Sequence, residues 1–166
     1  LTVSGLTSAN KVYDGTTTAG TIDHSSVTFT GLIGGDTLTA ANTTGSFANK
    51  TVGAGKTVTL SGTTYGGADV ANYSFSDQTS TTGTITAKPI TVSGLTAANK
   101  VYDGTTTAGT IDHSSVTFTG LIGGDTLTAA NTSGVFSDTT VGTGKTVTLS
   151  STTYGGADVA NSSFTA

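Results

Sequence analysis

The sequence of 166 residues contains no cysteine, methionine or tryptophan, and its one proline is Pro89. It also lacks glutamate and arginine and contains a single glutamine, Gln78, so residues that favour helices are scarce. The absence of cysteine excludes a disulfide framework but leaves the cellular compartment open. Threonine and valine favour strands, whereas the 24 glycines favour turns. The composition therefore predicts an all-β protein.

Charge of either sign is also scarce, because six lysines and ten aspartates leave a formal net charge of −4 at pH 7. Nucleic-acid partners require a basic face, so we expect none. No segment is long and apolar enough for insertion into a membrane, and no signal peptide pattern is found. We expect any export signal to lie outside these residues.

What the sequence has in abundance is repetition. Residues 1–77 align with residues 90–166 with 12 differences, which leaves 65 identities over 77 positions. The repeat length of 89 residues exceeds the roughly 20–50 residues of solenoid and propeller repeats. We therefore predict two domains, residues 1–88 and 89–166. The second copy lacks a counterpart of residues 78–88, which contain the expected last strand, and we expect it to expose an unpaired edge.

Segments in which apolar residues alternate with Thr or Ser predict strands with one buried face. In the first copy these segments are residues 1–4, 27–30, 37–39, 57–60 and 84–87, and turn signals separate them at 13–15, 34–36, 53–55 and 66–69. Strands at intervals of about 8–12 residues are typical of a sandwich, so we expect an immunoglobulin-like antiparallel β-sandwich of about seven strands per copy. The expected core consists of Val3, Leu6, Val12, Ile22, Val27, Phe29, Leu38, Phe47, Val58, Leu60, Tyr73, Phe75 and Ile85.

An ordered set of motifs resembles the YDG repeat. The set is Lys11-Val-Tyr-Asp-Gly-Thr-Thr, Gly34-Gly-Asp, Thr51-Val-Gly-Ala-Gly-Lys-Thr-Val, Gly67-Ala-Asp, Asn72-Tyr-Ser-Phe and Thr84-Ile-Thr-Ala-Lys-Pro. YDG repeats occur in tandem in large bacterial surface proteins, notably filamentous-haemagglutinin-like adhesins. The resemblance covers essentially both copies and implies an immunoglobulin-like sandwich, export, and a stalk or adhesin context. It implies no catalytic activity. The segment Ile22-Asp-His-Ser-Ser departs from the usual pattern.

The expected function is that of a structural spacer in the stalk of a secreted or surface-anchored bacterial adhesin, with neighbouring repeats of the same polypeptide as partners. The alternative is a binding module that engages a glycan, a host surface or a neighbouring chain, although aromatic residues make up only 7% of the sequence. We expect no enzyme, because neither copy offers a Ser-His-Asp order or a carboxylate pair. We expect no cofactor; calcium is possible, but the scattered aspartates argue against a calcium site. One histidine per copy supplies too few ligands for a transition metal.

A covalent bond between side chains is the one chemistry that the sequence makes worth testing, because cross-links stabilise small domains. A Thr–Gln ester is excluded, since Gln78 has no counterpart. His24 and its copy His113 are candidates for a bond to an aspartate; Asp14 and Asp103 are the first choices, and Asp36 and Asp69 are the next. A lysine amide would use Lys11 or Lys56, whose copies are Lys100 and Lys145. Alternatively, His24 is a surface or turn-end histidine with local hydrogen bonds. Each bond to an aspartate would remove one water, so the intact mass tests the hypothesis.

Overall fold

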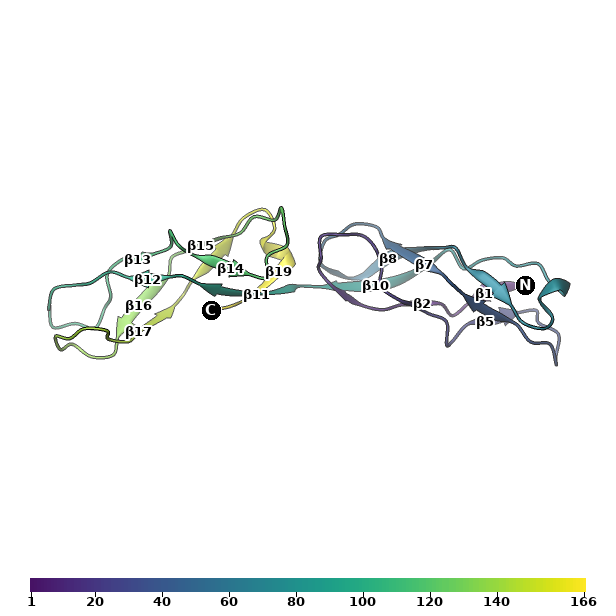
Figure 1. Ribbon diagram of the computed structural model, residues 1–166, viewed down its shortest axis with the longest axis horizontal. Helices are drawn as coiled ribbons and strands as arrows, with labels where there is room; N and C mark the ends of the chain where they lie inside the picture. Colours follow the sequence, from purple (N-terminus) through teal and green to yellow (C-terminus); the bar gives the residue numbers. More distant parts are fainter. The chain divides into compact units, whose positions relative to one another are not determined.

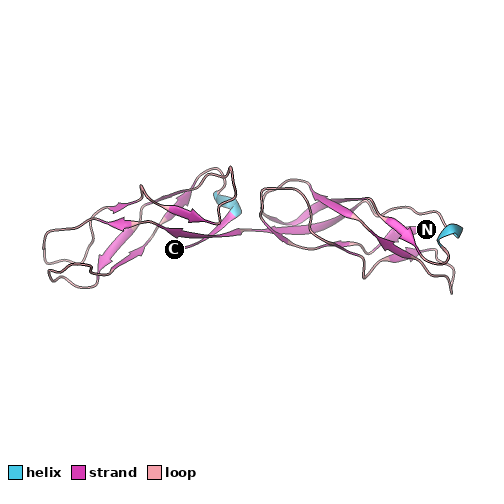
Figure 2. Cartoon of the chain, viewed as in Figure 1, coloured by secondary structure: helices cyan, strands magenta, loops and turns pink.

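The computed structural model describes residues 1–166 and is all-β, as the composition predicts (Figure 2). Besides strands it contains two short 3-10 helices, η1 (Val70–Asn72) and η2 (Val159–Asn161). The chain divides into two compact units, residues 1–87 (unit 1) and residues 88–166 (unit 2), and each is described by itself. The sequence prediction places the boundary between Lys88 and Pro89.

Unit 1 contains ten strands, most of them two to four residues long (Figure 1). They are β1 (Thr2–Ser4), β2 (Thr7–Ser8), β3 (Lys11–Val12), β4 (Ile22–Asp23), β5 (Thr28–Thr30), β6 (Thr39–Ala41), β7 (Thr44–Phe47), β8 (Gly53–Ser61), β9 (Thr64–Gly66) and β10 (Ser80–Thr86). The largest sheet has the order β3-β10-β8-β7, in which β10 runs antiparallel to β8 and parallel to β3. The other strands form the antiparallel pairs β1–β5, β2–β4 and β6–β9.

Unit 2 contains nine strands. They are β11 (Lys88–Ser93), β12 (Thr96–Ala97), β13 (Ile111–Asp112), β14 (Thr117–Thr119), β15 (Thr128–Ala130), β16 (Ser133–Phe136), β17 (Val147–Ser150), β18 (Thr153–Gly155) and β19 (Ser162–Thr165). Strand β11 pairs antiparallel with β14 and parallel with β19, and the remaining strands form the antiparallel pairs β12–β13, β15–β18 and β16–β17.

Alternation along the strands places one face in the core, as the period of two predicts. In β8, for example, Val58 and Leu60 are buried, whereas the residues that alternate with them, Thr57, Thr59 and Ser61, are exposed. Most of the expected core is buried or half-buried. The buried apolar side chains of unit 1 are Val3, Leu6, Tyr13, Ala19, Ile22, Phe47, Val58, Leu60 and Ile85.

Three aromatic rings form a second packed cluster in unit 1. The rings of Tyr65 and Phe75 stack with centroids 4.0 Å apart, and Phe29 meets both edge-on. Unit 2 repeats the cluster with Phe118, Tyr154 and Phe164. Because offset stacks and edge-to-face pairs are the favoured geometries of aromatic rings, this cluster explains why Phe29 and Phe75 pack well although each is only half-buried.

Four details of the sequence prediction are wrong. Val12 is 47% exposed, because the two-residue strand β3 turns the next side chain, Tyr13, into the core instead. Residues 53–55 are not a turn but the start of β8, where Gly53 pairs with Ile85 of β10. The predicted strand at 37–39 lies two residues later, at β6. Tyr73 is half-buried rather than enclosed, and its hydroxyl donates a hydrogen bond to Asp36.

Unit 2 contains no strand equivalent to β10, and with it one further strand is absent and another is shorter. Lys100 and Val101, the counterparts of β3, form no strand, and β17 begins only at Val147, whereas β8 begins at Gly53. Both segments are strands in unit 1 through their pairing with β10. Strand β10 therefore orders its neighbours as well as covering the core.

Candidate functional site

The motif around Tyr13 builds a cage of oxygen atoms around the ammonium group of Lys11. Lys11 Nζ donates hydrogen bonds to Asp14 Oδ1 at 2.8 Å, to the carbonyl oxygens of Thr16 and Thr18 at 2.9 Å each, and to Thr16 Oγ1 at 3.1 Å. The ring of Phe47 lies 5.8 Å from Nζ and adds a cation–π contact. We call residues 11–18 the first clasp, because the lysine fastens the loop to the strand that precedes it.

The loop itself is shaped by Asp14. Its Oδ1 accepts hydrogen bonds from the backbone N–H of Thr16 at 2.9 Å and from Thr16 Oγ1 at 2.8 Å, and Gly15 takes a positive φ of 77°. This is the turn that the Tyr-Asp-Gly sequence predicts. The hydrogen bond from Lys11 lowers the pKa of Asp14 from 3.8 to about 2, helped by the two bonds from Thr16. Asp14 is therefore a carboxylate at every ordinary pH.

Unit 2 contains the same first clasp. Lys100 Nζ donates to Asp103 Oδ1 and to the carbonyl oxygens of Thr105 and Thr107, each at 2.9 Å. The Lys100 hydrogen bond lowers the pKa of Asp103 to about 2. The clasp thus forms both with β10 beside it and without it, and its hydrogen bonds all lie within eight residues of the sequence.

A second clasp closes the loop before β8. Lys56 Nζ donates to Asn49 Oδ1, to the carbonyl oxygen of Thr51 at 2.5 Å and to Thr51 Oγ1 at 3.1 Å. In unit 2, Lys145 makes the equivalent contacts with Asp138 and Thr140. The two clasps share a pattern, an Asn or Asp two residues before a Thr, with the lysine five residues from that Thr.

Asn49 and Asp138 were missed by sequence reasoning, which retained only residues identical in both copies. They occupy equivalent positions, and both offer a side-chain oxygen to the lysine. Only Asp138 adds a charge, and the hydrogen bond from Lys145 lowers its pKa from 3.8 to about 2. The shared spacing of Asx, Thr and Lys in the first clasp is the signal that could have identified them.

This difference between the copies predicts a difference in acid sensitivity. Asp138 has a lowered pKa in the folded state, so its contribution to the stability of unit 2 is complete above pH 3.8 and disappears as the pH falls towards 2. Asp138→Asn should therefore destabilise unit 2 slightly at about pH 5 and leave it unchanged near pH 2. Asn49→Asp should stabilise unit 1 at about pH 5 only. Urea unfolding at a series of pH values measures both.

Each of these substitutions introduces the residue that the other copy already has, so each fold tolerates it. Lys50→Thr, the neighbouring exchange between the copies, serves as the control, because Lys50 is exposed and makes no ion pair. Equal pH profiles for wild type and Asp138→Asn would contradict the role assigned to this ion pair.

His24 lies away from the clasps. Its Nε2 forms a hydrogen bond of 2.9 Å with Thr43 Oγ1, which in turn bonds Thr63 Oγ1 at 2.8 Å. Thr43 is buried, and His113 repeats the arrangement with Thr132 and Thr152. No hydrogen bond or ion pair joins His24 to Asp14, whose carboxylate is used in the first clasp. The structure thus gives the histidine a partner distant in sequence rather than a local one.

Asp36 and Asp69, the other aspartates considered as partners of His24, fasten loops near η1. Asp36 Oδ2 accepts a hydrogen bond of 2.5 Å from the hydroxyl of Tyr73, which raises the pKa of that tyrosine. Asp69 Oδ2 accepts a hydrogen bond of 2.8 Å from the backbone N–H of Thr37. Neither aspartate contacts a lysine.

Each lysine considered for an amide lies beside a side chain that could supply the carbonyl: Lys11 beside Asp14, Lys100 beside Asp103, Lys145 beside Asp138, and Lys56 beside Asn49. Amide formation requires a neutral amine and a carboxyl group that can lose its oxygen as water. The oxygen cage stabilises the charged ammonium, and the low pKa of Asp14 keeps the carboxyl group ionised. The observed geometry is that of a charge-assisted hydrogen-bond network, which needs no bond to fasten the loop.

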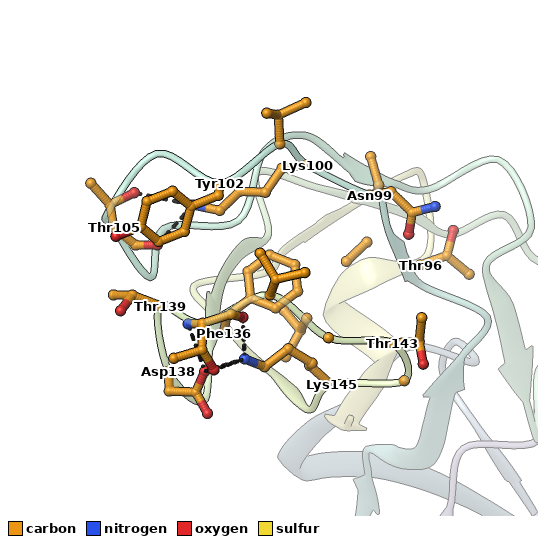
Figure 3. Close-up of a pocket in the computed structure, with 18 residues that line it drawn as sticks. Thr96, Asn99, Lys100, Tyr102, Thr105, Phe136, Asp138, Thr139, Thr143 and Lys145 are labelled. Atoms are coloured by element: carbon orange, nitrogen blue, oxygen red, sulfur yellow. Dashed lines mark hydrogen bonds and ion pairs between the residues drawn. The ribbon is translucent and has the colours of Figure 1, made fainter.

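The molecule contains no group of three or more His, Cys, Asp or Glu side chains placed to hold a metal ion. None of its helices has the length and apolar character of a membrane span. Unit 2 contains a cavity of about 880 Å³, which Lys100, Tyr102, Phe136 and Lys145 help to line (Figure 3).

Comparison with known proteins adds one finding to this geometry. No curated protein and no solved structure matches the chain. The family model of the YDG domain matches residues 1–82 and again residues 86–166, and so covers almost the whole chain. The chain therefore belongs to the YDG domain family, with one match in each half of its sequence.

Proposed function

We propose that this chain is a structural spacer from the stalk of a secreted or surface-anchored bacterial adhesin, built from immunoglobulin-like sandwiches in tandem. In this role the protein works outside the cell, catalyses nothing, and has neighbouring repeats of the same polypeptide as its main partners. Short antiparallel strands with one buried face support the sandwich, and membership of the YDG family supports the context. The side chains of Lys11, Lys56 and Asp69 fasten loops through hydrogen bonds and do not converge on a common site.

The observation that carries the proposal is the parallel pairing, in each unit, of the N-terminal strand with the segment that follows the 3-10 helix. In unit 2, β11 pairs with β19 through four consecutive residue pairs, from Lys88↔Ser162 to Thr91↔Thr165. In unit 1 a parallel bridge joins Thr2 to Ser76. Tension along the chain pulls such strands past each other, so all the hydrogen bonds between them must break together. This geometry resists stretching.

The pulling direction tests this function. Because the chain has no cysteine, force can be applied through pairs of introduced cysteines. The pair Lys88→Cys with Thr165→Cys loads β11 and β19 in shear, whereas Lys88→Cys with Ser162→Cys pulls at facing residues and separates the strands one pair at a time. We expect a several-fold higher unfolding force for the first pair in single-molecule stretching. Equal forces would contradict the mechanical role.

The alternative, a binding module for a glycan, a host surface or a neighbouring chain, has its own readout. A spacer should show no saturable binding to glycan arrays or to host cells. Saturable binding together with equal unfolding forces in the two directions would favour the binding module instead.

A further inference from the structure

Three donors converge on the side-chain carbonyl oxygen of Asn49 in the second clasp of unit 1. Thr51 donates to Asn49 Oδ1 from its hydroxyl at 2.7 Å and from its backbone N–H at 3.2 Å, and the ammonium group of Lys56 donates to the same atom. One of the three donors is therefore a full positive charge. This arrangement draws electrons towards Oδ1 and leaves the amide carbon, Cγ, open to attack by a nucleophile.

Donors placed in this way around a carbonyl oxygen form an oxyanion hole. They stabilise the negative charge that develops on the oxygen when a nucleophile adds to the carbon. Bonds from a charged donor are the strongest of this kind. Because the bonds strengthen as the charge develops, they lower the barrier by more than they stabilise the resting amide. Asn49 is also exposed, so water reaches it.

Unit 2 contains the product of such a reaction at the equivalent position. Asp138 is what hydrolysis of an asparagine side chain yields there, and its Oδ1 accepts hydrogen bonds from the backbone N–H and the hydroxyl of Thr140 and from Lys145. In Figure 3 the ammonium group of Lys145 points at this carboxylate. The hydrogen bond from Lys145 lowers the pKa of Asp138 to about 2. The second clasp thus accommodates the carboxylate and favours its ionised form.

We propose that Asn49 is a self-modification site, at which the second clasp of unit 1 converts the asparagine into aspartate after folding. In the first step the backbone nitrogen of Lys50 attacks Cγ and gives its proton to water, and Nδ2 takes up a proton and leaves as ammonia. A succinimide ring results. In the second step water adds to the ring, the bond between Cγ and the Lys50 nitrogen breaks, and that nitrogen regains a proton. The net change consumes one water and releases one ammonia.

The position of the donors also selects the product. A succinimide ring has two carbonyl carbons, and addition of water to the backbone carbon would give isoaspartate, whose main chain runs through the side chain. Addition to Cγ gives ordinary aspartate. The three donors act on Oδ1, which is bonded to Cγ, so they favour aspartate in both steps. Conversion therefore replaces a neutral hydrogen-bond acceptor of Lys56 by the carboxylate that unit 2 already has.

The test follows the full chain at neutral pH, once folded and once unfolded in guanidinium. Peptide mass spectrometry locates each conversion, and fragmentation distinguishes aspartate from isoaspartate. We expect Asn49 to convert at least about tenfold faster in the folded chain, with aspartate as the main product. Asn42 and Asn72 are exposed as well and serve as internal controls, because neither has a lysine donor on its carbonyl oxygen, and neither should convert faster on folding.

Variants separate the donors from the rest of the loop. Lys56→Met removes the charged donor and should slow the conversion at least about tenfold. Thr51→Val keeps the lysine but removes the hydroxyl donor, and should slow it as well if Lys56→Met disturbs the loop. Lys145→Met removes the equivalent lysine of unit 2 and should leave the rate at Asn49 unchanged. The proposal is overturned if folding does not accelerate the conversion, if isoaspartate predominates in the folded chain, or if neither Lys56→Met nor Thr51→Val slows it.

Discussion

Replacing Tyr13 by alanine should lower the free energy of unfolding of unit 1 by about 3–5 kcal/mol, the usual cost of removing a large buried aromatic ring. The same replacement of Tyr102 should change the stability of unit 2 by less than about 0.5 kcal/mol. The two residues occupy the same motif and the same position in the alignment. Only their surroundings differ, since Tyr13 is 1% exposed and Tyr102 is 63% exposed.

The large effect at Tyr13 has a specific structural cause. Its backbone N–H donates a hydrogen bond of 2.8 Å to the carbonyl oxygen of Thr86, the last residue of β10, so the tyrosine is tied to that strand as well as enclosed. Alanine would leave a cavity in the core of unit 1, whose other fully buried side chains are Leu6, Val58 and Ile85. The clasp lysine, Lys11, is two residues away and keeps its oxygen partners, so the first clasp survives the substitution.

Hydrogen exchange of the full chain measures the two effects separately. The segments 54–61 and 143–150 differ at their first residue, Ala54 or Thr143, and their peptides are therefore distinguishable by mass. We expect Tyr13→Ala to accelerate exchange in the first segment only, and Tyr102→Ala to accelerate neither. A large effect of Tyr102→Ala would contradict the 63% exposure of this side chain and show that unit 2 encloses it in solution.

Much of the fold follows from local patterns. Alternation of apolar residues with threonine predicts β1, β5, β8 and β10, and the Tyr13-Asp14-Gly15 sequence predicts a turn that Asp14 forms with its own neighbouring backbone. These features depend on residues close together in the chain, where side-chain chemistry and the two-residue period of strands decide the outcome. The clasp around Lys11 belongs to the same class.

Features that depend on distant pairing were not predictable. The sequence Gly53-Ala-Gly is typical of a turn, yet it extends a strand because Ile85 pairs with Gly53. His24 bonds Thr43, which lies 19 residues further along, and no local pattern marks that threonine. Asn49 and Asp138 differ between the copies and were therefore not considered, although each accepts a hydrogen bond from the lysine of the second clasp. The family resemblance identified the repeat but none of these partners.

Replacing Gly5 by alanine is the second substitution with a large expected effect, a loss of about 2–5 kcal/mol in unit 1. Gly5 has a φ of 85°, which costs an L-residue about 1–2 kcal/mol. A Cβ there would also overlap the carbonyl oxygen of Ser26 and come within 2.9 Å of its carbonyl carbon. Because these are backbone atoms, relief requires movement of the loop, and overpacking of this kind costs about 1–3 kcal/mol more.

Gly35 provides the matched control for this prediction. Its φ of 99° is equally unfavourable for alanine, but no atom lies within 4 Å of an added Cβ. Gly35→Ala should therefore cost only the conformational part, and the difference between the two variants isolates the clash with Ser26. Urea unfolding followed by exchange of unit 1 peptides gives both values. Equal losses would show that the loop at Ser26 moves aside freely. The expected difference would instead show that the close backbone contact between Gly5 and Ser26 is rigid. Unit 2 has the same contact between Gly94 and Ser115.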